Sequence, residues 1–461
     1  MLMGRLRRNT ELGLLLLGAL ITGGAYTLAS LGRAATIPAN IGPFLGVILG
    51  LFLVAHLAMR RLAPRADGLL LPLAGLLNGI GYVMLARLDK GLAQFQASWT
   101  AVGIVAFVIT LLVVRRIRDL ERYRYTFALI GILLLLLPLV PGVGTEQGGA
   151  RIWVRFGPIS FQPGEFAKIV LAVFFASYLV EKRELLGMTT WPRFRPFLPD
   201  PKHLGPVLLA WAAAVVVMTA EKDLGSSLLF FTLFMVLVWV ATERTAYLGV
   251  GAVLFGGAAY AAYHSFAHVH DRVKNWLNPW VDANNKGYQL IQGWYAMAAG
   301  GVAGTGLGLG SPDRIPERQN DFIFAVIGEE LGLLGATAVI VVFVLMVGCG
   351  LRIAARAEGA FEKLLATGLT ALLGIQSFII IAGVTRLLPL TGVALPFVSY
   401  GGSSLVANYV LLALLLRISE NTARREEERA EGEAAGPAAG ANALALGRGS
   451  DAALAGAGAA R

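Results

Sequence analysis

The sequence predicts an all-α integral membrane protein, a polytopic bundle of about twelve transmembrane helices. Of its 461 residues, 56% are hydrophobic and only 15% are charged, whereas soluble proteins carry roughly 25% charged residues. Apolar runs that approach the roughly 20 residues of a spanning helix recur over most of the chain. Because these runs leave no room for a soluble domain, residues 1–420 are expected to form one polytopic membrane domain.

The first expected span follows Arg5, Arg7 and Arg8. Its apolar run is longer than the roughly 7–15 residues of a signal peptide's apolar region, so it predicts a retained anchor. A long outer loop separates the ninth and tenth spans. The expected spans are approximately 12–31, 41–59, 68–86, 96–114, 125–141, 165–180, 205–220, 226–242, 247–266, 331–350, 364–384 and 404–418.

The distribution of basic residues predicts the orientation. With the N-terminus inside, the inner segments hold 24 Lys and Arg residues and the outer segments hold 12, as the positive-inside rule requires. Both termini are therefore expected in the cytoplasm, in a multi-pass protein of the cytoplasmic (inner) membrane. The basic excess indicates attraction to anionic membrane lipids and does not indicate a nucleic-acid partner. The outer segments are then roughly 142–163, 267–330 and 385–403.

Two further segments carry recognisable patterns. Apolar and aromatic side chains recur at helical spacing over 286–299, which predicts an amphipathic helix near the outer interface. Glycines are dense from Gly300 to Gly310, but no preceding strand and no P-loop lysine accompany them, so a nucleotide site is not expected. The Ala- and Gly-rich stretch 421–461 lacks core-forming side chains and is expected to be a disordered cytoplasmic tail.

Asp321 is the first candidate for chemistry, because it lies where the long polar loop meets an apolar run. A carboxylate at a membrane boundary is costly to desolvate. It is either a helix cap or a general base or cation ligand at the outer face. Glu329 and Glu330 follow within the apolar run, either as interface-level charges or as cavity groups.

Other charged residues gather in the outer segments. Arg151 lies in the first, and Glu165 and Lys168 are three residues apart on one helix face. They form either a helix ion pair or a functional pair, since a lysine inside an apolar helix needs a partner or a role. Lys222 and Asp223 lie between two short apolar runs, in either a turn or a polar cavity.

The cysteine and histidine residues offer little chemistry. Cys349 is the only cysteine, so no internal disulfide is possible. His264, His268 and His270 cluster without an HExxH pattern, and structural roles at the interface are favoured over a metal site.

Six motifs in order resemble the SEDS (shape, elongation, division and sporulation) family of RodA/FtsW-type proteins, over roughly residues 10–420. The extra apolar segments near the N-terminus are similar to the longer, RodA-like subgroup. Gly164 and Asn320 depart from the residues usual in the family. The motifs are QPGEFAK at 162–168, EKDLGSS at 221–227, GYQ at 287–289, GTGLG at 304–308, DFIFA at 321–325 and SYGGSS at 399–404.

The resemblance implies a glycosyltransferase that polymerises lipid II, the undecaprenyl-diphosphate disaccharide-pentapeptide, at the outer face of the membrane. Asp321 matches the family's essential aspartate and would be the general base. A class B penicillin-binding transpeptidase and other elongation or division proteins would be partners. No cofactor is certain and the metal ligands are unknown, although Mg²⁺ or Mn²⁺ could bridge the diphosphate and a carboxylate. Substrate-binding positions would be Arg151, Glu165, Lys168, Lys222, Asp223, Glu329, Tyr400 and Ser403.

Two alternatives from other classes stay open. A lipid II flippase or other transporter would also use interrupted helices and intramembrane charge, and glycan synthesis by the purified protein would exclude it. A structural scaffold of the elongation machinery would not need Asp321, so complementation by Asp321→Asn would identify one.

Overall fold

The computed structural model describes residues 2–36, 41–147, 150–157, 159–187, 211–212, 216, 219 and 221–457. The long helices are α1 (Leu2–Ala34), α2 (Ile41–Leu62), α3 (Leu70–Leu88), α4 (Lys90–Val113), α6 (Arg124–Leu136), α7 (Pro163–Gly187), α9 (Leu224–Thr242), α10 (Ala246–Ser265), α13 (Ile323–Arg356), α14 (Ala360–Val384) and α15 (Gly402–Ala457). The shorter ones are α5 (Arg118–Arg122), α11 (Ala267–Leu277) and α12 (Tyr288–Gly300), with 3-10 turns η1 (Leu137–Leu139), η2 (Pro279–Asp282) and η3 (Pro312–Arg314).

The all-α membrane architecture is confirmed, but the count of twelve spans is not. Within the described ranges, nine helices are long and apolar enough to cross a membrane. The expected spans at 41–59 and 125–141 form the helices α2 and α6, which are not among the nine, and α6 is short. The expected span 205–220 lies largely outside the described residues.

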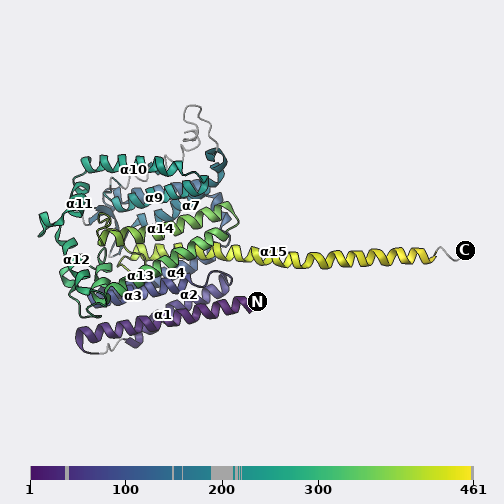
Figure 1. Cartoon of the computed structure of the whole chain (residues 1–461), viewed down its shortest axis with the longest axis horizontal. Helices are drawn as coiled ribbons and strands as arrows, with labels where there is room; N and C mark the ends of the chain where they lie inside the picture. The colour runs from purple at the N-terminus through teal and green to yellow at the C-terminus, as the bar shows by residue number, and fades with distance from the viewer. Residues whose placement is uncertain are drawn as a thin grey trace.

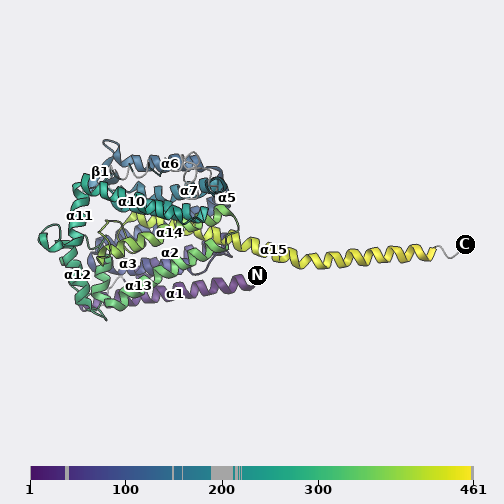
Figure 2. The same ribbon diagram turned by 45° about the horizontal axis from the view of Figure 1, so that its top comes forward.

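The long helices run side by side, and α11 and α12 lie across one end of the bundle (Figures 1 and 2). The N-terminal end of α1 and the exit of α15 lie at the opposite end. The helices α11 and α12 of the segment 267–330 therefore lie at the end of the bundle opposite to the start of α1 and the exit of α15, and the side of the membrane on which each end lies stays a prediction.

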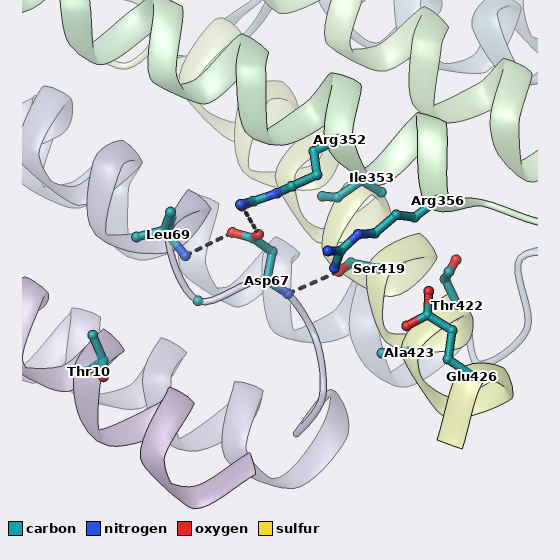
Figure 3. Close-up of a pocket in the computed structure, with 11 residues that line it drawn as sticks. Thr10, Asp67, Leu69, Arg352, Ile353, Arg356, Ser419, Thr422, Ala423 and Glu426 are labelled. Carbon is teal, nitrogen blue, oxygen red and sulfur yellow. Dashed lines mark hydrogen bonds and ion pairs between the residues drawn. The ribbon is translucent and has the colours of Figure 1, made fainter. Parts of the chain in front are cut away.

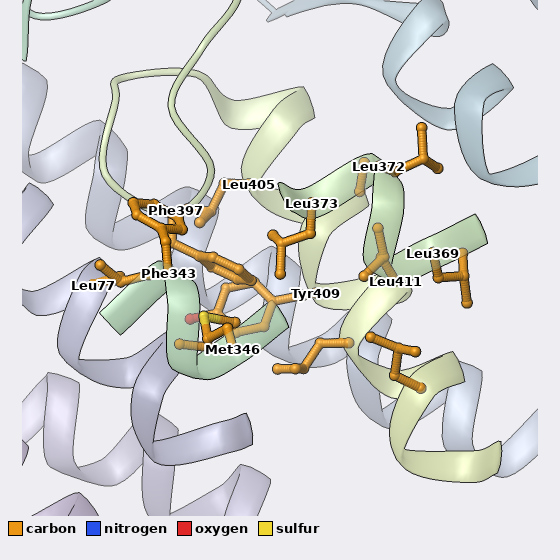
Figure 4. Packing of buried hydrophobic residues seen from close by; sticks show 14 of the residues in the cluster. Leu77, Phe343, Met346, Leu369, Leu372, Leu373, Phe397, Leu405, Tyr409 and Leu411 are labelled. Atoms are coloured by element: carbon orange, nitrogen blue, oxygen red, sulfur yellow. The ribbon is translucent and has the colours of Figure 1, made fainter. Parts of the chain in front are cut away.

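The core lies where α3, α4, α13, α14 and α15 meet, and Tyr409 is its largest fully buried anchor (Figure 4). The Tyr409 hydroxyl accepts a 2.8 Å hydrogen bond from Asn78 Nδ2. A side chain at Gly103 would meet the Tyr409 ring at 2.4 Å, so α4 and α15 pack at close range only because that residue is glycine.

The loop between α2 and α3 is fixed to α13 and α15 at the end of the bundle where the termini lie. Asp67 pairs with Arg352 at 2.5 Å, and its backbone N–H donates to Ser419 (Figure 3). The α15 helix continues beyond residue 420, with Asn421 and Thr422 buried and Arg425 bonded to the Glu362 carboxylate. The disorder expected from residue 421 stays a prediction, although the structure has helix there as far as Ala457.

The outer segments contain regular secondary structure. The first forms a three-stranded antiparallel sheet of β1 (Gly144–Gln147), β2 (Ala150–Phe156) and β3 (Ile159–Phe161). The predicted amphipathic helix is confirmed as α12, which buries Leu290, Ile291 and Ala296 on one face. The segment 267–330 also contains α11, which the sequence analysis did not anticipate.

The helix after Asp321 begins eight residues earlier than the expected 331–350 and is broken inside. Gly332 has φ 66° and ψ −166°, a conformation open almost only to glycine. The N–H groups of Leu333 and Leu334 donate to the carbonyls of Gly301 and Val302, which satisfies the backbone at the break.

Candidate functional site

Asp321 is the second residue before α13, in a turn that is held by the segment 385–403. The Ser399 hydroxyl donates to the Asn320 carbonyl at 2.7 Å, and the Tyr400 N–H donates to the Gln319 carbonyl at 2.9 Å. Ser399 Oγ also accepts from the Leu395 N–H. The backbone on the N-terminal side of Asp321 is therefore anchored to a loop that lies far away in sequence.

Arg272 of α11 lies on the other side of the same loop. Its Nη1 donates to the carbonyls of Leu390, at 3.3 Å, and Thr391, at 2.9 Å. A Cβ placed on Gly392 would lie 3.7 Å from Asp321 Oδ2 and 3.8 Å from Arg272 Nη2. The carboxylate and the guanidinium therefore both face Gly392, which has φ +77° and leaves open the space that a side chain would fill.

The surroundings of Asp321 give its carboxyl group a pKa suited to proton transfer. Burial raises the pKa of Asp321 to about 7, and Glu317 adds to the rise while Arg272 opposes it. A carboxylate with a pKa near the working pH can accept a proton and release it again. The helix-cap alternative is not supported, because Phe322 is the N-cap of α13 and no side chain caps it.

Lys168 and Glu165 form a buried network with Gln376 of α14. Lys168 Nζ donates to both Glu165 oxygens and to Gln376 Oε1, each at 2.9 Å. Gln376 Nε2 in turn donates to the Ala394 carbonyl at 2.8 Å. The three donors of Lys168 are thus used inside the protein, and the network supports the loop that passes Asp321.

Two more of the predicted site residues, Tyr400 and Ser403, belong to the segment 385–403 itself. Ser403 accepts the Gln162 N–H at 2.9 Å, which ties the start of α7 to the start of α15. Tyr400 is half-buried beside the Gln319 carbonyl. Both therefore hold neighbouring segments in place around Asp321.

The 221–225 turn packs against the same loop from α9. A side chain at Gly225 would collide with Val393 at 2.4 Å and Thr391 at 3.0 Å. Asp223 caps α9 by accepting from the Ser226 N–H, and the exposed Lys222 lies 3.9 Å from Glu146. The cluster therefore lies in a turn that contacts the candidate site, and its part in substrate binding stays a prediction.

Arg151 and Glu221 join the outer sheet to this turn. The Arg151 N–H donates to the Glu221 carbonyl at 3.0 Å, while its side chain reaches the Val140 carbonyl at 3.5 Å. Burial raises the pKa of Glu221 to about 8, with a further contribution from Asp223. Arg151 is therefore linked to the loop that carries Gly392 only indirectly, through the 221–225 turn.

Glu329 and Glu330 contact a different region, the glycine-rich segment 304–311. Glu330 pairs with Arg87 at 2.8 Å and accepts from the Gly308 N–H. Glu329 Oε1 accepts from the Ser311 N–H at 2.7 Å. Neither residue shares a described contact with Asp321, so the structure gives both of them a role in fixing the glycine-rich segment.

Sequence reasoning missed Arg272 and Gln376. Arg272 was one of twelve outer basic residues and Gln376 one polar residue in an apolar run, so neither had a local signal.

The clustered histidines pack against an aromatic ring. The Tyr263 ring contacts both His264 and His270. Within the described ranges, no three His, Cys, Asp or Glu side chains are grouped to hold a metal ion.

The chain is similar in sequence to proteins of a known family. A family model of cell cycle proteins, FtsW/RodA/SpoVE, matches residues 70–424. The peptidoglycan glycosyltransferase RodA of Mycobacterium tuberculosis is 45% identical over 437 residues, covering 91% of this chain and 92% of the relative. A probable peptidoglycan glycosyltransferase FtsW of Geobacter metallireducens is 36% identical, covering 70% of this chain and 84% of its own.

Solved structures share the fold. A chain from a study of a peptidoglycan synthase complex that coordinates polymerization and crosslinking superposes with TM-score 0.65 at 26% identity, covering 77% of this chain and 98% of that one. The Thermus thermophilus rod shape determining protein RodA gives TM-score 0.54 at 25% identity, covering 77% and 96%. This multi-pass membrane protein belongs to the FtsW/RodA/SpoVE family, the SEDS proteins, and is similar to its RodA members.

Proposed function

We propose that this chain is a peptidoglycan glycosyltransferase that polymerises lipid II into glycan strands. The observation that carries the proposal is the half-buried Asp321 carboxylate, which lies with Arg272 beside Gly392. The names of the relatives that cover most of the chain support the same reaction.

In the proposed reaction, Asp321 takes the proton of the acceptor sugar hydroxyl as that oxygen bonds to the anomeric carbon of the donor. The bond between that carbon and the diphosphate oxygen breaks, and the leaving group carries away the electron pair. Attack opposite the leaving group inverts the anomeric centre. The product is a glycan longer by one disaccharide, with undecaprenyl diphosphate released.

Arg272 is the nearest described cation for the developing negative charge of the diphosphate. Its Nη1 is fixed by two backbone carbonyls, so the guanidinium is oriented before substrate arrives. Lys168, which the resemblance implied as a substrate contact, instead supports the loop through Gln376. A role for Lys168 in the reaction would therefore act through the position of that loop.

The described side chains also indicate how a divalent metal ion would be held at the site. Among the described residues, no protein metal site of three His, Cys, Asp or Glu ligands is present. A divalent cation such as Mg²⁺ or Mn²⁺ would therefore be held largely by the substrate diphosphate, with Asp321 the nearest carboxylate at the site.

We place the protein in the cytoplasmic membrane with both termini in the cytoplasm and 267–330 outside. The basic residues at the end of the bundle that carries the termini support this orientation. A class B penicillin-binding transpeptidase is the proposed partner, because a structural neighbour comes from a complex that couples polymerization to crosslinking.

A lipid II transporter is the second candidate, and the break of α13 at Gly332 is the observation that favours it. The break, however, is capped by backbone hydrogen bonds, and the adjoining Glu330 is neutralised by Arg87. The test is to incubate purified protein with labelled lipid II, alone and with the partner transpeptidase, and to separate products by size. Glycan strands support the transferase, while transbilayer movement of lipid II without glycan would support the transporter.

A further inference from the structure

An apolar groove lies between α1 and α2, which precede the family match at 70–424, and α3, with which that match begins. Its volume is about 390 Å³. The lining residues are Leu12, Leu15, Leu16, Gly18, Ala19 and Thr22 of α1, Gly46, Ile48, Leu49, Gly50, Phe52 and Leu53 of α2, and Pro72, Gly75 and Leu76 of α3. Thr22 is the only lining residue with a polar side chain, so the groove suits a hydrocarbon.

Protein contacts close the groove at both ends. Toward the N-terminal end of α1, the Glu11 carboxylate and His56 Nδ1 are hydrogen-bonded at 2.9 Å, which joins α1 to α2. At the other end, Thr22 contacts α3 so closely that a Cβ on Gly79 would lie 2.2 Å from its hydroxyl. From Leu12 to Thr22 the groove extends about 15 Å along α1.

The groove is open sideways, toward the bilayer. Leu16 and Leu53 on its rim are 49% and 48% exposed. A side chain at Gly46 or Gly50 would meet nothing within 4 Å. These two glycines therefore leave a space that no described protein group fills and that a chain from the surrounding lipid can enter.

A basic residue continues the line of the groove. Arg60 follows Leu53 by seven residues, which places it on the same face of α2 and about 10 Å further toward the end of the bundle with the N-terminus. Arg60 is exposed. The groove thus leads toward a cation on the side of the bundle where the N-terminus lies, whereas α11, which carries Arg272, lies at the opposite end (Figure 1).

We propose that this groove binds one anionic phospholipid, with an acyl chain between α1, α2 and α3 and its phosphate beside Arg60. An arginine is suited to a phosphate because its planar donors match the oxygens. The site is independent of glycan synthesis, since it rests on helices that carry none of the candidate catalytic groups.

The test is native mass spectrometry of the full chain in detergent, titrated with phosphatidylglycerol and with phosphatidylcholine. We expect one tightly bound phosphatidylglycerol per chain. Gly46→Leu and Gly50→Leu, made separately, fill the groove without a clash and should each weaken binding by at least about tenfold. Gly42→Leu is the matched control, because that glycine is on α2, meets nothing within 4 Å and does not line the groove.

A second pair of variants tests the headgroup. Arg60→Gln should weaken phosphatidylglycerol about tenfold and phosphatidylcholine by less, because both lipids carry the phosphate but only phosphatidylglycerol has a net negative charge. Arg61→Gln, about 100° further round the helix, should change neither. Binding by both leucine variants at the wild-type level would overturn the groove, and equal binding of the two lipids by wild type would overturn the role of Arg60. Displacement of phosphatidylglycerol by equimolar undecaprenyl phosphate would show that the occupant is a polyprenyl chain instead.

Discussion

Asp321 Oδ2 and Arg272 Nη2 lie 3.7 Å and 3.8 Å from the point where a Cβ on Gly392 would stand, and that glycine leaves free the space beside both groups. Hydrogen bonds join the loop that carries Gly392 to the Asp321 turn, to α11 and to α14. Gly225, at the start of α9, packs closely against the same loop. The site is therefore assembled from the segment 267–330, which carries Arg272 and Asp321, and from segments before and after it in the chain.

Gly392→Ala tests whether the open space is used. Alanine at φ +77° costs about 1–2 kcal/mol, and its methyl group would contact both the carboxylate, at 3.7 Å, and the guanidinium, at 3.8 Å. We expect a lower melting temperature and a further loss of polymerisation at temperatures where the variant is fully folded. Gly401→Ala is the control, because its Cβ would make only ordinary contacts at 3.6 Å.

The rate of polymerisation should rise with pH as Asp321 loses its proton, with a midpoint near its pKa of about 7. Arg272 lowers that pKa, so Arg272→Gln should raise it and move the midpoint to higher pH. Rates measured from pH 5.5 to 9 for wild type and Arg272→Gln check both points. An unchanged midpoint in the variant, with a reduced rate throughout, would mean that Arg272 acts on substrate alone.

Lys168→Met should destabilise the protein, because it leaves the buried Glu165 carboxylate without its cation. Loss of one partner of a buried pair costs about 3–5 kcal/mol. Combining it with Glu165→Gln should recover part of the loss. A Lys168→Met variant as stable as wild type but inactive would contradict the buried network and restore a direct substrate role.

Gly332→Ala tests the break in α13. An alanine there would adopt a conformation that costs about 1–3 kcal/mol, and its Cβ would lie 2.3 Å from the Gly304 backbone nitrogen. We expect a clearly lower melting temperature in detergent. Gly348→Ala in the same helix meets nothing within 4 Å and should be neutral or slightly stabilising.

The orientation is tested with single cysteines in a Cys349→Ala background. Probes at the exposed Asn284 and Ser311 should react with an impermeant maleimide in intact spheroplasts. A probe at the exposed Ala355 should react only after lysis. The reverse pattern would place Asp321 in the cytoplasm and contradict extracellular glycan synthesis.

Hydropathy could predict most of the helices because a spanning segment is defined by its own composition. It placed the start of α13 late because Ile323–Glu330 ends in two carboxylates, whose neutralisation by Arg87 and by backbone N–H groups is a tertiary contact. The break at Gly332 was equally hidden, since Gly328 and Gly335 look the same in sequence.

The candidate site was predicted in part. Asp321 had both a motif and an unusual position, whereas Arg272 gained its importance only when α11 folded beside the loop at Gly392. The alternation of Arg151, Trp153 and Arg155 with apolar residues is a strand signal that could have revealed β2. The substrate contact of Lys168 stays a prediction, and its network with Gln376 could not be anticipated because it joins residues 208 positions apart.

The most direct test of the account is glycan polymerisation from lipid II by purified wild-type protein and by Asp321→Asn, each with the partner transpeptidase. Asparagine keeps the shape of the side chain and removes its capacity to accept a proton. We predict that the variant folds, inserts and melts like wild type, yet polymerises about 10²–10⁴-fold more slowly. Polymerisation by Asp321→Asn at a rate close to wild type would contradict the assignment of Asp321 as the general base.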